Sequence, residues 1–192
     1  MKKKTSRKFA IIGTGMVGTA IGCLLKKAGH EITAMADLSD SHLKRARTYI
    51  AAACHRHASA AARCGEYILI TTPDDHILSA CEDISRHSAV RGKIVFHMSG
   101  AGGLDLLKPA AEMGAKTAII HPLQSFSSID GAIASIPGSY FGVTADAGAK
   151  KISADIVRDM HGCPIYISPD QKPLYHAAAC IAAMESGKHV YC

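Results

Sequence analysis

Strand-like and helix-like runs alternate along nearly the whole chain, and this alternation constrains the fold more than any other feature of the sequence. Apolar runs typical of strands occupy residues 8–13, 31–37, 66–77, 92–100, 115–126, 139–146 and 163–170. Helical patterns lie between them, at residues 19–30, 41–53, 77–85, 104–114 and 147–162. Parallel strands need long crossovers, and helical crossovers cover both faces of a sheet. The sequence therefore predicts an α/β fold with a doubly wound, mostly parallel sheet.

Two segments fall outside this alternation. Residues 127–138 carry small side chains without a clear period, and we expect a loop there. The last helix should begin near Asp170, with Pro173 in its first turn, where a missing backbone N–H costs nothing.

The positive charge is concentrated at the start of the chain. The formal net charge is +6, and five of these charges belong to Lys2, Lys3, Lys4, Arg7 and Lys8. A basic tail on a nearly neutral remainder argues against a nucleic-acid partner. No apolar run is long enough to span a membrane, so no membrane partner is expected. The seven cysteines are scattered and lack a CxxC pair, which is typical of reduced thiols in a cytoplasmic protein and gives no reason to expect a metal site.

A glycine pattern, GxGxxG, stands between the first expected strand and the first expected helix. Its first glycine makes a tight turn, its second lets the backbone approach a pyrophosphate, and its third allows close helix packing. The N-terminus of the helix attracts the phosphate charge. We therefore expect a dinucleotide, NAD or NADP, on this loop. The loop residues expected to bind it are Gly13, Thr14, Gly15, Met16, Val17 and Gly18.

The end of the second strand bears on the choice between NAD and NADP. Asp37 follows Gly18 by 19 residues, where a carboxylate can accept hydrogen bonds from ribose hydroxyls and favour NAD. Ser39 and Arg45 follow it and could instead hold the 2′-phosphate of NADP. Asp37 could also be a simple helix cap. The sequence leaves these alternatives open.

The run TTPDD ends another expected strand. Ligands bind at the carboxyl edge of open α/β sheets, so Thr72 and Pro73 should line the cofactor crevice. For Asp74 and Asp75 we favour a structural role, in which one of them caps the next helix.

Two further strands end in polar residues at the same edge. Ser99 and Gly100, in HMSGAGG, should face the nicotinamide end of the crevice, whereas His97 should be buried within its strand. His121, in HPLQSF, could orient a substrate carbonyl or carboxylate, or could be a loop residue with its own partners.

Lys172 and His176 lie one helical turn apart near the end of the chain and share one helix face. Ala177, Ala178 and Ala179 keep this helix slim enough to approach another surface. If that face looks into the crevice, His176 should lie near Ser99 and His121. The alternative is a solvated Lys172 and a His176 that packs against the sheet.

Taken in order, the motifs GxGxxG, TPDD, HMSGA, HPLQSF, FGVTAD and KPLYHAAA resemble a branch of Rossmann oxidoreductases. The N-terminal half of that branch is similar to deazaflavin-dependent NADP reductases, and its C-terminal half is a domain of unknown function. More distantly, the chain resembles the 6-phosphogluconate dehydrogenase superfamily. The resemblance covers the chain up to about Ala183. In several of these relatives a lysine and an amide residue one turn apart serve hydride transfer, and Lys172 and His176 occupy the analogous place.

The end of the chain departs from this pattern. Met184 stands where family members have an asparagine, and the sequence then turns polar and ends where they continue into a helical domain. The resemblance thus implies three segments: a basic disordered tail (residues 1–8), a dinucleotide-binding Rossmann domain (9–168) and the start of a truncated C-terminal helical domain (169–192). A homodimer through the C-terminal helix is one arrangement that it allows.

The resulting prediction is an NAD(P)-dependent oxidoreductase that transfers hydride to or from a small polar carbonyl, hydroxyl or imine compound. Lys172 or His176 would be the general acid or base, and His121 would complete the catalytic set. The alternative is a dinucleotide-binding sensor, or an inactive remnant, without the helical domain that encloses the substrate.

Overall fold

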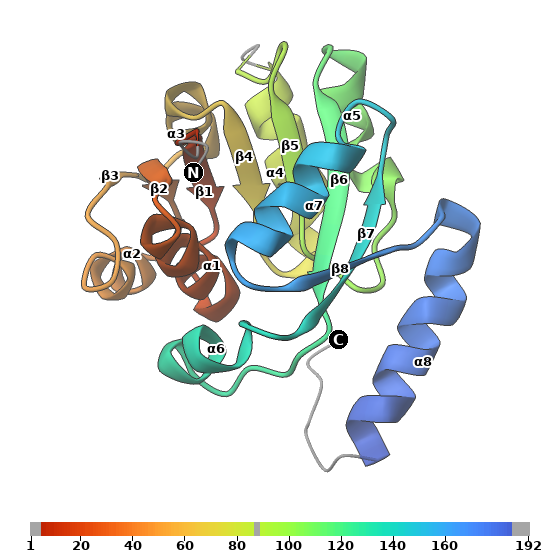
Figure 1. Ribbon diagram of the computed structural model, residues 1–192. Coiled ribbons are helices and arrows are strands. Elements are labelled where there is room, and N and C mark those ends of the chain that lie inside the picture. Colours follow the sequence, from red (N-terminus) through yellow and green to blue (C-terminus); the bar gives the residue numbers. More distant parts are fainter. Residues whose placement is uncertain (1–4, 87–88, 186–192) are drawn as a thin grey trace.

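One eight-stranded sheet forms the centre of the computed structural model, which describes residues 5–86 and 89–185. The strand order is β3-β2-β1-β4-β5-β6-β7-β8 (Figure 1). The strands are β1 (Lys8–Ile12), β2 (Glu31–Ala36), β3 (Ala53–His55), β4 (Tyr67–Ile70), β5 (Ile94–His97), β6 (Lys116–Pro122), β7 (Tyr140–Ala145) and β8 (Cys163–Tyr166).

Helices cover both faces of the sheet. The α-helices are α1 (Met16–Lys27), α2 (Asp40–Ala46), α3 (Ala58–Cys64), α4 (Ile77–Arg86), α5 (Lys108–Glu112), α6 (Ile129–Ser135), α7 (Lys150–Asp159) and α8 (Lys172–Glu185). Three short 3₁₀ helices are η1 (Asp74–His76), η2 (Leu104–Leu107) and η3 (Pro169–Gln171). Helices α1, α2, α6 and α7 pack on one face and α3, α4 and α5 on the other (Figure 1). The predicted doubly wound, mostly parallel α/β fold is confirmed.

The topology gathers the expected site residues at one edge. The chain runs outward from β1 to β3, returns to β4 on the other side of β1, and continues to β6 with parallel pairing throughout. The carboxyl ends of β1, β4, β5 and β6 therefore meet at one edge, with the change of direction between β1 and β4. Ligands of open α/β sheets bind at such a switch point.

The sheet alternates its apolar side chains between two cores. Phe9 and Ile11 of β1 face the α1 side, whereas Ile68 and Ile70 of β4 face the α4 side, and all four side chains are fully buried. Burying a large apolar side chain stabilises a fold by about 1.5–3 kcal/mol. The two cores thus make a rigid platform for the loops at the carboxyl edge.

Two expected elements differ from the structure. The helix expected at residues 41–53 ends at Ala46, because Ile50 is buried as a connecting residue and the short edge strand β3 follows it. The loop expected at residues 127–138 contains α6, which Ser128 caps by accepting from the Gly131 N–H at 3.0 Å. Because α6 begins at the carboxyl edge and packs against α1, the chain enters β7 from that edge, and β7 pairs with β6 in the antiparallel sense.

The two ends of the described chain also bear on the expected segments. Lys8 is the first residue of β1, and the Arg7 guanidinium pairs with Asp159 at 2.7 Å, so the folded part begins before residue 9. At the other end, η3 leads into α8, which runs beside the β7–β8 side of the sheet, apart from the other helices (Figure 1). The polar end that follows Glu185 lies outside the described residues. Within the described part of the chain, no helix has the length and apolar character to cross a membrane.

Candidate functional site

The glycine loop joins β1 to α1, and its three glycines answer to different constraints. Gly13 has a φ of +94°, and a Cβ there would lie 2.7 Å from the Thr72 backbone nitrogen. A Cβ on Gly18 would clash with the Gly13 carbonyl oxygen. By contrast, no atom lies within 4 Å of the Cβ position of Gly15. The first and third glycines are therefore required by the fold itself, and the second leaves open space at the start of α1.

This open space fits the phosphates of a dinucleotide. Gly15 is the N-cap of α1, a helix of 12 residues without an acidic side chain in its first turn, so nothing on the helix opposes an anion. Met16 and Val17 begin the helix half-buried, with Val17 against the core. The loop thus presents backbone N–H groups where a pyrophosphate would lie.

Asp37 ties the glycine loop to the end of β2. One carboxylate oxygen accepts from the Thr14 N–H at 2.7 Å and from the Thr14 hydroxyl at 3.0 Å, while the other accepts from the Ser39 N–H at 2.8 Å. Burial alone would raise the pKa of Asp37, but the hydrogen bonds from Ser39 and Thr14 outweigh it and lower the pKa. Asp37 is therefore a carboxylate beside the loop. The cap of α2 is Ser39, whose hydroxyl accepts from the His42 N–H at 3.4 Å, so Asp37 is not that cap.

The loop after β4 forms hydrogen bonds with the glycine loop and with the loop after β5. Thr71 donates to the Gly13 carbonyl at 2.6 Å, and the Thr72 hydroxyl is buried without a partner. Pro73 precedes η1, which has no side-chain cap, so the expectation that Asp74 or Asp75 caps the next helix is wrong. Asp74 instead accepts from the Ser99 hydroxyl at 2.5 Å. This bond links the loop after β4 to the loop after β5.

Lys172 is the most confined charge of the site. Its side chain is only 4% exposed, and its Nζ donates to the carbonyls of Ser99 at 3.1 Å and Gly100 at 2.6 Å. Burial lowers the pKa of Lys172 to about 8, although the Asp74 charge opposes the change. The solvated Lys172 considered as an alternative is therefore wrong.

Two imidazoles converge on Gly100. A Cβ at Gly100 would lie 2.7 Å from His176 Nδ1 and 2.8 Å from His121 Nε2, and the two rings are 6.5 Å apart at 71°. Burial, followed by electrostatic interactions with Lys172 and His176, lowers the pKa of His121 to about 3. His121 is therefore neutral at physiological pH. His176 has a buried Nδ1 without a partner, and its Nε2 lies 3.5 Å from the Cys180 sulfur.

His97 supports the loop after β5 from below. As expected it is fully buried in its strand, and its ring accepts from the Ser99 N–H at 3.1 Å while the other nitrogen lies 3.0 Å from the Gly103 carbonyl. Burial lowers the pKa of His97 to about 4. The neutral ring fixes the turn that presents Ser99 and Gly100.

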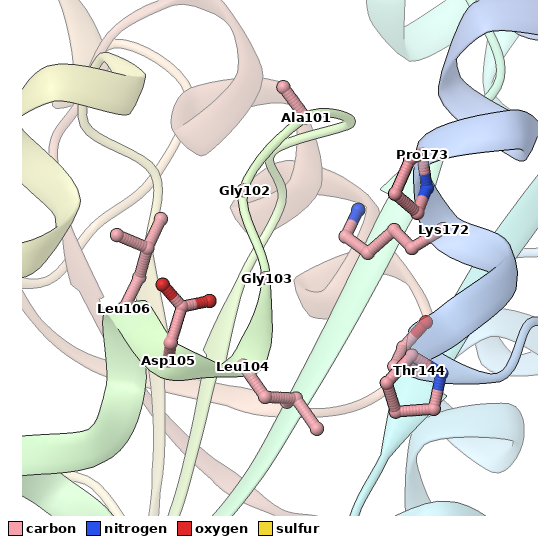
Figure 2. Close-up of a pocket in the computed structure, with 10 residues that line it drawn as sticks. Ala101, Gly102, Gly103, Leu104, Asp105, Leu106, Thr144, Lys172 and Pro173 are labelled. Atoms are coloured by element: carbon pink, nitrogen blue, oxygen red, sulfur yellow. The ribbon is translucent and has the colours of Figure 1, made fainter.

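A pocket of about 560 Å³ opens beside Lys172. It lies between residues 101–106 and the first turn of α8, and in Figure 2 the Lys172 side chain extends from α8 toward the loop that carries Gly102. Asp105 and Lys172 are its charged lining residues. The pocket gives a small molecule room to approach the lysine.

The structure thus brings together five residues expected at the site: Ser99, Gly100, His121, Lys172 and His176. Sequence reasoning missed the contacts of Asp74 and Tyr175. The Tyr175 hydroxyl lies 3.1 Å from His121 Nδ1. In the sequence, only the position of Tyr175 between Lys172 and His176 indicated that it could belong to the site. Arg45, expected near a 2′-phosphate, lies in the last turn of α2 and is exposed.

Comparisons with known proteins confirm the expected resemblance. The family model of the Rossmann-like domain matches residues 2–122, and that of a domain of unknown function, DUF2520, matches residues 139–185. No curated protein matches the chain.

Three solved structures illustrate the fold. A Bacteroides fragilis protein provisionally assigned as an NADP oxidoreductase superposes with a TM-score of 0.81 at 12% identity, over 95% of this chain and 68% of that one. Prephenate dehydrogenase of Aquifex aeolicus, solved with hydroxyphenyl propionate and NAD⁺, gives 0.75 at 15%, over 96% and 70%. 3-Hydroxyisobutyrate dehydrogenase of Mycobacterium tuberculosis gives 0.76 at 17%, over 95% and 60%. The chain therefore spans between 60% and 70% of these three proteins.

Proposed function

The chain belongs to the family of Rossmann-like domains, and on this basis we propose that it is an NAD(P)-dependent oxidoreductase acting on a small polar carbonyl, hydroxyl or imine compound. The observation that carries the proposal is the buried Lys172, held at the carbonyls of Ser99 and Gly100 on the same sheet edge as the glycine loop. A buried lysine with a perturbed pKa is typical of a functional site.

The residues present fit a dinucleotide. Gly15 and the start of α1 would hold the pyrophosphate, and Asp37 would face the adenosine ribose. Thr72, Pro73 and Ser99 would line the opposite end of the crevice. When bound, the nicotinamide supplies the hydride chemistry, so the protein has to position the substrate and move a proton.

Lys172 is suited to the proton transfer. An ammonium group has three N–H donors, and two of those of Lys172 are engaged by backbone carbonyls. The third can donate to a substrate oxygen or nitrogen. A pKa of about 8 places the group close to neutral pH, where a general acid can also give up its proton. His121 and His176 would complete the polar wall around that atom.

A binding and turnover experiment tests the proposal. NADH and NADPH binding would be measured by calorimetry, and turnover on a panel of carbonyl, hydroxy and imine compounds by nicotinamide absorbance. Lys172→Met should keep cofactor affinity and lose turnover. Lys151→Met, on a side chain that is 89% exposed, is the matched control and should change neither.

The second candidate function, a dinucleotide-binding sensor without catalysis, differs from the first in its expected turnover. It predicts cofactor binding with no turnover on any compound of the panel, and no effect of Lys172→Met. Absence of cofactor binding would contradict both functions.

Two further features bear on the oligomeric state and the cellular location of the protein. On α8, Leu174 and Ile181 are 76% and 59% exposed and would suit the expected homodimer contact, which light scattering would test by giving twice the mass of the chain. The scattered cysteines, which include no CxxC pair, support the expected cytoplasmic location.

A further inference from the structure

A tyrosine from α8 is joined to the histidine of β6. The Tyr175 hydroxyl lies 3.1 Å from His121 Nδ1, and the two rings meet edge to face, with centroids 5.8 Å apart at 87°. Both side chains are half-buried. A hydrogen bond of this length together with a perpendicular ring contact fixes the orientation of the imidazole.

The sheet makes room for this pair at one position. Gly142 stands directly opposite His121 in the antiparallel β6–β7 ladder. A Cβ at Gly142 would lie 2.7 Å from the Cζ and hydroxyl oxygen of Tyr175, so any other residue there would displace the tyrosine ring. The cross-strand neighbour of His121 is thus a glycine on which the tyrosine lies, with its hydroxyl directed at the imidazole.

The protonation states of His121 and Tyr175 decide which ring nitrogen of His121 carries the proton. Burial lowers the pKa of His121 to about 3, helped by Lys172, His176 and His97, so the ring is neutral and carries a single N–H. Burial raises the pKa of Tyr175, so the phenol keeps its proton, although a hydrogen bond with the Gly142 backbone opposes the rise. Because the phenol oxygen already has a backbone partner, its own O–H is free to donate to His121 Nδ1. That bond leaves the imidazole proton on Nε2.

We propose that Tyr175 is a positioning residue that holds His121 as its Nε2–H tautomer, with this N–H directed to the Gly100 side of the site as a donor to a substrate oxygen. The inference rests on the proposed function of the same site and narrows its substrate class. Lys172 and the Nε2–H of His121 both offer donors beside Gly100, so a substrate group that contacts both of them has to be an acceptor. A carbonyl or carboxylate oxygen meets this requirement, whereas a protonated imine has no lone pair to offer.

Nitrogen NMR of the histidine rings tests the proposal without any substrate. In isotope-labelled protein at neutral pH, the His121 signals, assigned by their loss in His121→Gln, should show Nε2 protonated and Nδ1 unprotonated. Tyr175→Phe keeps the ring over Gly142 but removes the hydroxyl, and should lose this single tautomer in favour of a mixture or of Nδ1–H. Tyr140→Phe, on a tyrosine of β7 that is 55% exposed, is the matched control and should leave the His121 signals unchanged.

Two results would overturn the assignment: an Nδ1–H tautomer in the wild-type protein, or an unchanged Nε2–H tautomer in Tyr175→Phe. Neither depends on turnover, so a failure of the tautomer assignment is distinguishable from a failure of the oxidoreductase proposal. If the enzyme assay has found a substrate, Tyr175→Phe should also raise KM more than it lowers kcat for compounds with a carbonyl or carboxylate oxygen.

Discussion

Replacing Lys172 with methionine should remove a specific pH dependence of stability. The pKa of Lys172 falls from 10.5 to about 8 in the folded chain because the side chain is buried. At about 1.4 kcal/mol per unit of pKa, the buried charge costs the folded state about 3 kcal/mol at neutral pH. The folded chain releases this proton near pH 8 and the unfolded chain near pH 10.5, so the wild-type protein gains stability as the pH rises through that window.

The magnitude follows from the same two values. Between pH 7 and pH 10, linkage gives the wild-type protein a gain of about 2.5 kcal/mol in unfolding free energy that the methionine variant lacks. At pH 7 the variant should differ little from wild type. Methionine removes the charge, but it also leaves the carbonyls of Ser99 and Gly100 without their donor, at a cost of about 1–3 kcal/mol each. The two effects oppose each other.

Urea unfolding followed by circular dichroism at pH 7 and pH 10 measures the effect. The relevant quantity is the difference between wild type and Lys172→Met at each pH, because other lysines and tyrosines titrate equally in both proteins. Lys151→Met, on an exposed lysine, should track the wild type at both values. A difference between Lys172→Met and wild type that stays constant across this range would refute the reasoning, since it would mean that Lys172 titrates normally.

Three further changes probe the rest of the site. Gly15→Val should weaken dinucleotide binding by roughly tenfold or more in calorimetry while leaving the fold intact, since the Cβ position is open; unchanged affinity would count against the assigned loop. Asp37→Ser should shift the ratio of the NADH and NADPH dissociation constants toward NADPH, because it removes a carboxylate that repels a 2′-phosphate. If the wild-type protein already prefers NADPH and Arg45→Ala removes that preference, the result would favour the alternative in which Arg45 holds the 2′-phosphate. Ser99→Ala should lower the unfolding free energy by about 1–2 kcal/mol in thermal melts, because it breaks the link to Asp74; an unchanged melting temperature would contradict this.

Regular periodicity in the sequence made most of the fold predictable. The two elements that were predicted wrongly, β3 and α6, each have a local cause. The strands around Ile11 and Ile68 are buried on both faces, so their apolar runs stand out in the sequence. Strand β3 has only three residues at the sheet edge, too few to give a pattern, and the apolar Ile50 before it extended the expected helix. Helix α6 did carry a signal, in the Ser128 cap and the apolar residues that follow it at helical spacing. The small residues around it concealed that signal.

The candidate site divides in the same way. Helical spacing placed Lys172 and His176 on one face, and strand ends placed Ser99 and His121 at one edge, because both inferences use only local geometry. The hydrogen bond between Asp74 and Ser99 and the contact of Tyr175 with His121 join residues far apart in the chain. No spacing rule encodes such pairs. They depend on how closely two loops or a helix and a sheet approach, which only the folded chain determines.

In the glycine loop, one position of the GxGxxG motif indicates ligand binding, and the other two are required by the fold. Gly13 and Gly18 cannot change without a clash against the protein's own backbone, so their presence follows from the tight strand-to-helix turn whether or not a ligand binds. Gly15 meets no such restriction, since an alanine side chain would fit at the N-cap of α1 and would cost the helix nothing in packing. A glycine that the fold does not need is explained by an external group that must come close to the backbone. The middle glycine, rather than the complete pattern, is therefore the residue at which the structure supports a bound dinucleotide.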